Sequence, residues 1–372
     1  MIGPVVRLAR RALPLAGVAV LAVLLLAVAP AVLTDFRLGN LAKYCCYAIA
    51  AVGIGLAWGR GGMLVLGQGL FFGLGAYVMA MHLKLEAAGP EGIPDFMMLY
   101  GDGTMPGWWE PFRSGPFTLA MIVIAPAFVA TVVGLAVFKR RIKGAYFAIL
   151  SQALAVAFAT LIVAQIEVTG GFNGLSAFTS FFGYNLYDPV NQRMLFYIAA
   201  GTLVAMILVV FQLYRSRFGE LLVATRDAEE RVRFLGHDPA NIKLVAFVIA
   251  AVMASIGGAI FVPVVGIVSP LDVDELASIA LIAGVALGGR ATLLGPAIGA
   301  LAVGYARTSL SETFPGSWTY FQGALFVLVI LLLPGGLGQI GGNARRLLAA
   351  LRRKPIAATP KHASKPAEEV AA

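Results

Sequence analysis

Residues 194–236 read MLFYIAAGTLVAMILVVFQLYRSRFGELLVATRDAEERVRFLG, and this stretch decides the fold. Its first part, 194–214, is an apolar run of the ~20 residues that an α-helix needs to cross a bilayer core. Its second part predicts an amphipathic helix, because less polar residues recur there at steps of three and four. These residues are Leu221, Thr225, Ala228, Val232 and Leu235. The chain therefore joins a membrane span to a charged helix outside the membrane.

The charged helix also has ionic support on its polar face. Asp227 precedes Arg231 by four residues, and such a pair stabilises an exposed helix by roughly 0.2–0.5 kcal/mol. Glu229 precedes Arg233 in the same way, and Gly236 ends the helix. We interpret this helix as a docking element for a water-soluble partner. A solvated surface helix is the alternative.

The composition of the whole chain is that of a membrane protein. Of 372 residues, 59% are hydrophobic and 13% are charged, and the mean hydropathy is +0.86, which is too apolar for a water-soluble domain. We expect an all-α, polytopic transmembrane helical bundle of about ten spans. The expected spans are 12–33, 41–58, 62–83, 117–138, 145–166, 194–214, 242–265, 276–288, 293–311 and 320–338. Glycines interrupt 276–288, which makes it a candidate re-entrant segment.

The positions of Lys and Arg predict which segments are cytoplasmic, because short basic loops stay on that side. We expect a basic cytoplasmic N-terminus at 1–11, a transmembrane domain at 12–340 and a basic, disordered cytoplasmic tail at 341–372. Within the transmembrane domain, the acidic loop 84–116 is expected outside and the loop 215–241 inside. The net charge of +9 is spread over these separate segments, which argues against nucleic-acid binding.

Several kinds of chemical site lack their sequence signatures. No GxxxxGK[ST] phosphate-binding loop occurs, so any energy from ATP has to come through another subunit. The three histidines lack metal-ligand spacing, and the adjacent Cys45 and Cys46 are interpreted as small core residues. We predict no metal site, no bound cofactor and no enzymatic activity, since no nucleophile and base can be paired.

Polar residues and glycines interrupt some apolar runs. An amide inside a span needs a partner or a wet cavity, so Gln68 and Gln152 are candidates for lining a solute path. The glycine-rich turn at 170–175 adds the backbone of Gly171 and the amide of Asn173 as further candidates. An ordinary turn is the alternative there. Close helix packing is expected at Gly69, Gly73, Gly295 and Gly299.

These features, in their order along the chain, resemble a known family. The segments that carry the resemblance are 66–77, 93–97, 152–154, 170–175, 226–236 and 288–290. Over about 43–340, the chain resembles the inner-membrane permeases of ABC importers for branched-chain amino acids and urea, most closely the urea type.

The resemblance implies a set of partners. In such importers a homologous second permease completes the path, a periplasmic binding protein delivers the solute, and two ATP-binding subunits use ATP on the cytoplasmic side. The chain would lie in the bacterial inner membrane with both termini inside, and it would work by alternating access. The residues expected to couple it to the ATPase are Gly219, Arg226, Asp227, Glu229, Arg231, Leu235 and Gly236.

The solute is predicted to be urea, because a neutral molecule suits a path lined by amides. The segment 278–284 departs from the urea-type pattern, so a branched-chain or other hydrophobic amino acid, or a short amide, is the alternative. A self-contained secondary transporter or channel is the rival from another class. It would need ion-coupling carboxylates in mid-span, whereas the carboxylates here lie mostly in loops or near span ends.

Overall fold

The computed structural model describes residues 4–313, 320, 323–324 and 327 of the chain. Its longer helices are α1 (Pro4–Val23), α3 (Asp35–Ile54), α4 (Gln68–Ala88), α6 (Gly115–Phe138), α7 (Ala145–Ala164), α9 (Pro189–Arg215), α10 (Arg217–Asp227), α12 (Pro239–Val265), α13 (Glu275–Gly288) and α14 (Gly295–Thr313). The shorter helical pieces are η1 (Leu24–Val28), α2 (Ala29–Val32), η2 (Gly55–Arg60), α5 (Asp95–Tyr100), η3 (Glu110–Arg113), α8 (Ile166–Thr169), η4 (Gly171–Asn173), α11 (Glu229–Phe234) and η5 (Pro270–Asp272). Four two-residue strands complete the described structure: β1 (Leu175–Ser176), β2 (Ser180–Phe181), β3 (Tyr184–Asn185) and β4 (Ile267–Val268).

Six helical segments of the described residues are long and apolar enough to cross a membrane. They are Pro14–Val32, Asp35–Arg60, Gly115–Phe138, Ala145–Ala164, Pro189–Arg215 and Pro239–Val265. Helices α4 and α14 are long enough, but they are less apolar than these six segments. The mostly helical membrane fold is confirmed. The prediction of about ten spans is not confirmed, and most of the expected span 320–338 and all of the tail 341–372 lie outside the described residues.

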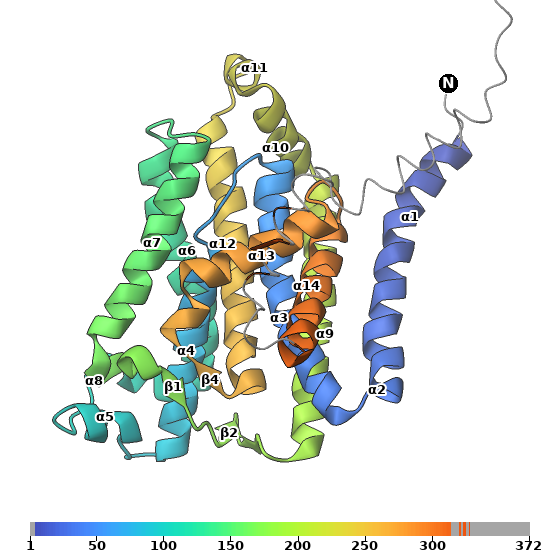
Figure 1. Ribbon diagram of the computed structural model, residues 1–372. Coiled ribbons are helices and arrows are strands. Elements are labelled where there is room, and N and C mark those ends of the chain that lie inside the picture. The colour runs from blue at the N-terminus through green and yellow to red at the C-terminus, as the bar shows by residue number, and fades with distance from the viewer. Residues whose placement is uncertain (1–3, 314–319, 321–322, 325–326, 328–372) are drawn as a thin grey trace, which may run out of the picture.

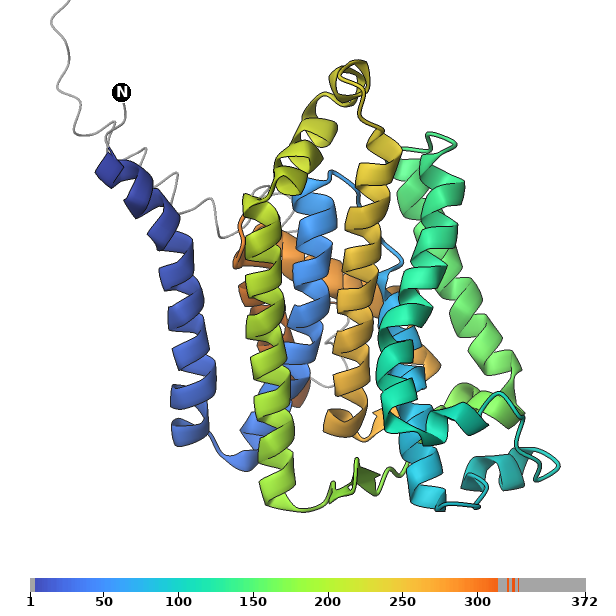
Figure 2. The ribbon, with the colours of Figure 1, turned by 180° about the vertical axis from the view of Figure 1, so that it is seen from behind.

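The long helices stand side by side, with α3, α4, α9 and α12 at the centre of the bundle (Figure 1). Helices α6 and α7 cover one flank, and α1 stands apart on the other (Figure 2). Helices α10 and α11 project from one end, which also holds the start of α1 and the turn between α6 and α7. The segments with dense positive charge therefore share one end, and α5 and the strands lie at the opposite end.

Small residues let the central helices approach closely. A Cβ atom added at Gly75 of α4 would lie 2.0 Å from the carbonyl oxygen of Ser255 in α12. At Gly258 of α12 it would lie 1.9 Å from the carbonyl oxygen of Phe72 in α4. Neither position has room for a larger side chain, so α4 and α12 pack with their backbones in near contact, as small residues allow in membrane helices.

Short strand pairs connect segments at the end of the bundle opposite α10 and α11. Strand β1 pairs antiparallel with β4, with Leu175 opposite Val268, so the segment after α8 is tied to the segment after α12. Strands β2 and β3 form a small antiparallel hairpin. The sequence pattern predicts no strand here, because two-residue strands are too short to show alternation.

The charged surface segment differs from its prediction. It is two helices, α10 and α11, separated at Ala228, whose φ of −150° and ψ of 65° are not helical. We call residues 217–236 the arm. The prediction of one helix with a single continuous apolar face is therefore wrong. Leu222, Thr225 and Val232 are buried, whereas Leu235 is exposed. The expected pair of Asp227 with Arg231 is replaced by Asp227 with its neighbour Arg226.

The segment 276–288 forms most of α13, which has 14 residues. At 1.5 Å per residue this helix is about 21 Å long, less than the ~30 Å of a hydrocarbon core. It lies across the bundle rather than along it (Figure 1). Its close contact with α14 depends on glycine, since a Cβ atom at Gly299 would lie 2.0 Å from the carbonyl oxygen of Gly284.

Candidate functional site

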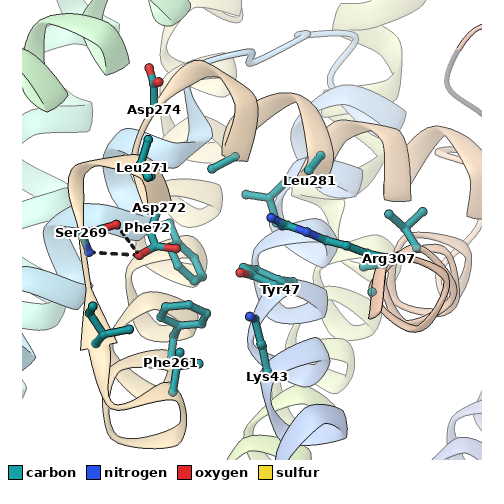
Figure 3. Close-up of a pocket in the computed structure, with 17 residues that line it drawn as sticks. Lys43, Tyr47, Phe72, Phe261, Ser269, Leu271, Asp272, Asp274, Leu281 and Arg307 are labelled. Carbon is teal, nitrogen blue, oxygen red and sulfur yellow. Dashed lines mark hydrogen bonds between the residues drawn. The ribbon is translucent and has the colours of Figure 1, made fainter. Parts of the chain in front are cut away.

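A cavity of about 470 Å³ opens beside α3, between α12 and the pair α13 and α14. Figure 3 shows two of its walls facing one another. Lys43 and Tyr47 extend from α3 and Arg307 from α14, while Asp272 of η5 lies on the other side. Residues more than 260 positions apart in the sequence thus meet in one place.

The cavity contains charged groups of both signs. Lys43 and Arg307 are the cations that line it, and Asp272 and Asp274 are the anions. The carboxylate of Asp272 accepts hydrogen bonds from the backbone N–H of Ser269 at 3.0 Å and from its hydroxyl at 3.2 Å (Figure 3). The bond from the Ser269 N–H is one half of a capping box at the start of η5, and in the other half the hydroxyl of Ser269 accepts from the backbone N–H of Asp272. Together these bonds hold the Asp272 side chain in place. Lys43 and Asp272 are half-buried, whereas Arg307 is exposed. Half-buried charges are costly unless they are paired, which is why residues of this kind indicate a solute site.

Three aromatic rings form an apolar wall of the same cavity. Phe72 of α4 and Phe261 of α12 pack edge to face with their centroids 5.4 Å apart. Tyr47 contacts both rings, at 5.7 and 5.4 Å. The ammonium of Lys43 lies 5.9 Å from the centroid of the Phe261 ring, within reach of a cation–π interaction. The cavity therefore offers an apolar surface next to charges of both signs.

The polar residues that the sequence suggests for a path lie elsewhere. Gln68 is buried, and its Nε2 donates to the carbonyl oxygen of Ala250 at 2.7 Å. Within the described part of the chain, its Oε1 and both amide atoms of Gln152 make no hydrogen bond. Asn173 is exposed and donates to the hydroxyl of Tyr100 at 3.0 Å. None of these three residues lines the cavity, and their role in a path stays a prediction.

The turn at 170–175 has a conformation that glycine favours. Gly171 is buried with a φ of +57°, and a Cβ atom there would lie 2.7 Å from the side chain of Ile166. Gly174, with a φ of +68°, lies against the carbonyl oxygen of Val268. Gly171 does not line the cavity. The turn therefore packs α8, which follows the C-terminal end of α7, against the strand pair.

The glycines expected at helix contacts lie at close approaches. A Cβ atom at Gly69 would lie 2.5 Å from the hydroxyl of Ser278, and one at Gly73 would lie 2.3 Å from the side chain of Val273. At Gly295 and Gly299 it would meet backbone oxygens of α13 and of the turn after it, at 2.4 Å or less. These positions place α4 and α14 against η5 and α13, next to the cavity.

Glu229 ties the arm to the body of the protein. Its Oε2 accepts from the ammonium of Lys243 in α12 at 2.8 Å and lies 2.9 Å from that of Lys143, in the turn after α6. Its Oε1 accepts from Arg233 at 3.4 Å, the ion pair that the four-residue spacing predicts. Partial burial acts to raise the pKa of Glu229, but the hydrogen bonds from Lys243 and Lys143 outweigh it and hold the pKa below its ordinary value.

A second attachment of the arm is made by Arg226. Its Nη1 donates to the carbonyl oxygen of Gly59 in η2 at 2.6 Å. Its Nε and Nη2 donate to the two carboxylate oxygens of Asp227 at 2.7 and 3.2 Å, a fork that holds the guanidinium in place. The bond from Arg226 keeps the pKa of Asp227 below its ordinary value.

The tip of the arm exposes an apolar pair. Phe234 is 89% exposed and Leu235 is 78% exposed, beside the exposed Arg231. Gly236, with a φ of +83°, turns the chain back toward α12. At the base of the arm, a Cβ atom at Gly219 would lie 2.4 Å from the carbonyl oxygen of Leu213, so the exit from α9 is tight.

The charged residues of the cavity are not among the candidates expected from the sequence, although the sequence carries a signal for two of them. Lys43 lies inside an expected span, and Arg307 lies inside another. An ionisable residue within an apolar run is by itself a reason to expect a functional site. Asp272 carries no such signal, because it lies in a connecting segment whose position only the fold reveals.

Comparison with known proteins gives a consistent result. Residues 36–333 match the family model described as "Branched-chain amino acid transport system / permease component". The chain is 30% identical over 314 residues to the high-affinity branched-chain amino acid transport system permease protein LivM of Salmonella typhimurium, covering 78% of this chain and 67% of that protein. It is 29% identical to LivM of Escherichia coli over the same shares, and 23% identical over 304 residues to the permease protein LivH of Escherichia coli, of which 90% is covered. No solved structure matches the chain.

Proposed function

The chain belongs to the permease component family of branched-chain amino acid transport systems, and from this membership we propose that it carries an amino acid with an apolar side chain across the membrane as one subunit of an ABC importer. A second, homologous permease completes the path, because both LivM and LivH resemble this chain. A periplasmic binding protein supplies the solute, and two ATP-binding subunits supply the energy.

The observation that carries the choice of solute is the pairing of opposite charges with aromatic rings in one cavity. An amino acid has a carboxylate for Lys43 and Arg307, an ammonium for Asp272, and an apolar side chain for the rings around Tyr47. Lys43 and Asp272, which are half-buried, then gain partners that offset the cost of removing them from water. Urea carries no charge, so it offers neither a carboxylate to Lys43 and Arg307 nor an ammonium to Asp272.

The sequence predicts urea as the solute, and the relatives do not distinguish it from the amino-acid alternative. Amides that line the path favour urea, but Gln68 and Gln152 do not line the cavity. The charged and aromatic lining of the cavity therefore supports an amino acid as the solute.

A direct test is uptake by the reconstituted importer of labelled leucine and, separately, of labelled urea. We expect ATP-dependent uptake of leucine, and a loss of about tenfold or more in its apparent affinity in Asp272→Asn, the factor expected for one charge-assisted hydrogen bond. The matched control is Asp102→Asn, an exposed carboxyl in the outer loop, which leaves leucine uptake unchanged. Urea uptake by the wild-type protein without leucine uptake overturns the proposed solute.

The arm is proposed as the docking element for an ATP-binding subunit. The exposed Phe234 and Leu235 give it an apolar surface, and adjacent apolar residues of this size on a projecting element mark a protein contact. Glu229 is not part of that surface, since its side chain is turned toward Lys143 and Lys243. Its expected role in coupling becomes one of holding the arm.

The proposed topology follows the distribution of charge. The end that holds the arm, the start of α1 and the turn between α6 and α7 is cytoplasmic, and the loop 84–116 with its excess of acidic residues is periplasmic. The protein is a multi-pass inner-membrane protein with both termini inside. A re-entrant position for α13 fits its 14 residues. The orientation can be tested with the variants Asp102→Cys and Leu235→Cys, each treated with a membrane-impermeant thiol reagent in intact cells and in lysed cells. The unaltered chain, whose Cys45 and Cys46 are buried, gives the background reaction.

A further inference from the structure

We propose that a cavity between the arm and the turn joining α6 to α7 binds a phosphate group, which belongs either to an anionic phospholipid or to a soluble phosphate. This site is distinct from the cavity of Lys43 and Asp272, and it goes beyond the proposed transport of a solute.

The cavity measures about 470 Å³, within the range of about 300–1,000 Å³ that small-molecule sites have. Its walls come from the arm, the α6–α7 turn, the first turns of α12 and the segment that follows η2. We call it the arm cavity. Among the described residues, none lines both it and the cavity of Lys43. A ligand in the arm cavity would contact segments at the end of the bundle where basic residues gather (Figure 2).

Basic side chains outnumber acidic ones in the arm cavity. The described residues that line it include one acidic side chain, Glu229, and three basic ones, Arg226, Lys143 and Lys243. The ammonium groups of Lys143 and Lys243 converge on a single oxygen, Oε2 of Glu229, at 2.9 and 2.8 Å. Two cations this close repel one another, and one carboxylate neutralises only one of them. An added anion would therefore gain charge-assisted hydrogen bonds from both lysines.

The start of α7 adds donors to the same cavity. Gly144, Ala145 and Phe147 line it. The first N–H groups of a helix have no acceptor within that helix, and no side chain caps those of α7. This end of a helix also carries a partial positive charge that attracts phosphates. Lys243 brings its charge to the cavity from α12, so the site does not depend on the helix end alone.

The apolar part of the cavity fits the remainder of a phospholipid. Phe138 and Phe147 line it, and their ring centroids lie 5.2 Å apart. Tyr146 and Ile149 of α7 are 78% and 64% exposed on a segment long and apolar enough to span a membrane. Basic pockets between membrane helices near the cytoplasmic surface bind anionic lipid headgroups. A soluble phosphate needs only the polar part of the same cavity, so the two sources share one site.

A phosphate suits this arrangement better than a carboxylate does. Its oxygens point in several directions, so one group can accept from Lys143, from Lys243 and from the backbone at the start of α7 together. A carboxylate has only two oxygens in one plane, and Glu229 already supplies such an oxygen to both lysines.

The test uses the full chain in bilayer discs of phosphatidylcholine. In one series the discs contain increasing fractions of phosphatidylglycerol, and native mass spectrometry counts the phosphatidylglycerol that stays bound. In the other series inorganic phosphate is added, and the unfolding temperature is measured. Both series include Lys143→Gln, Lys143→Arg and Ala145→Trp, of which the last fills the cavity from an exposed position. The matched control is Arg140→Gln, which removes the same charge from an exposed residue of the same turn that does not line the cavity.

We expect saturable binding of at least one probe by the wild-type chain. Lys143→Gln weakens it about tenfold or more, the factor expected for loss of one charge-assisted hydrogen bond. Lys143→Arg keeps most of the affinity, because a guanidinium also binds phosphate. Ala145→Trp abolishes binding although every charge is still in place. Arg140→Gln changes the affinity by less than about twofold, since salt screens an exposed charge outside the site.

The outcomes identify the source of the phosphate or overturn the site. Retention of phosphatidylglycerol that inorganic phosphate does not displace assigns the lipid, whereas stabilisation by inorganic phosphate alone assigns the soluble anion. Absence of saturable binding of both probes overturns the inference. Equal weakening in Lys143→Gln and Arg140→Gln also overturns it, because it shows attraction to surface charge only, and wild-type affinity in Ala145→Trp places the ligand elsewhere. No solute or ATP-binding subunit enters these measurements, so their failure leaves the proposed function untouched.

Discussion

Replacing Glu229 by Gln should loosen α11 without unfolding the protein. The bond to Lys243 joins side chains that are 17% and 14% exposed, so its loss costs about 1.5–3 kcal/mol, the range for a hydrogen bond to a charged group. Lys143 is 47% exposed, and its ion pair contributes about 0–1 kcal/mol. An amide retains some hydrogen bonding, so we expect a net loss near 2 kcal/mol in the free energy of local opening.

Amide hydrogen exchange measures that opening residue by residue. A loss of about 2 kcal/mol corresponds to about thirtyfold faster exchange in α11. Exchange in the centre of α12 stays unchanged, because the global fold is intact. The control is Glu220→Gln, an exposed carboxyl in the first turn of α10, for which we expect less than about a fivefold change. Equal protection of α11 in wild-type protein and Glu229→Gln would refute the view that ion pairs hold the arm.

The pH dependence of the same exchange gives a second check. The pKa of Glu229 in the folded protein lies below its ordinary value of 4.5. The stabilisation of α11 is therefore fully present above pH 4.5 and is lost as the pH falls through the lowered pKa. Protection of α11 relative to Glu229→Gln should be constant from about pH 7 to pH 5 and should disappear in more acidic buffer.

Three further predictions follow from the packing and the charges. Gly75→Ala should lower the unfolding temperature in detergent, since overpacking costs about 1–3 kcal/mol, whereas Gly201→Ala, with open space around it, should leave it unchanged or raise it. Burial acts to raise the pKa of Asp95, but the hydrogen bond from Lys84 at 2.8 Å outweighs burial and lowers the pKa overall. The stabilisation from this ion pair should therefore be lost as the pH falls through the lowered pKa, and Asp95→Asn should remove that part of the pH dependence of unfolding. Leu235→Asp should leave the protein in the membrane at normal abundance but reduce co-purification of the ATP-binding subunits, and undiminished co-purification would argue against docking at the tip.

The apolar runs predict the long helices well, because length and hydropathy alone determine a span. The expected runs 117–138 and 145–166 compare with Gly115–Phe138 and Ala145–Ala164 in the structure. The third run, expected at 62–83, is instead the helix Gln68–Ala88. Its first residues are not helical, since the backbone N–H groups of Leu66 and Gly67 donate to the hydroxyl of Ser151 in α7.

The break in the arm could not be predicted from local preference. Alanine is the best helix former, so Ala228 gives no sign of a boundary. Contacts far away in the sequence decide it, because Glu229 is drawn toward Lys143 and Lys243 and Arg226 toward Gly59. The shared cavity of Lys43 and Arg307 could not be predicted for the same reason, although each is an ionisable residue within an apolar run. Periodicity describes one helix at a time, and the two residues line one cavity only when α3 and α14 are placed together.

The balance of charge in the cavity has a consequence for the work of transport. Among the described residues, two basic and two acidic side chains line it, so the two kinds are balanced there, and an amino acid carries no net charge either. Moving an elementary charge across a membrane potential of 100 mV costs about 2.3 kcal/mol. A voltage across the bilayer would neither help nor oppose the passage of such a solute, and uptake should be the same in polarised and depolarised vesicles.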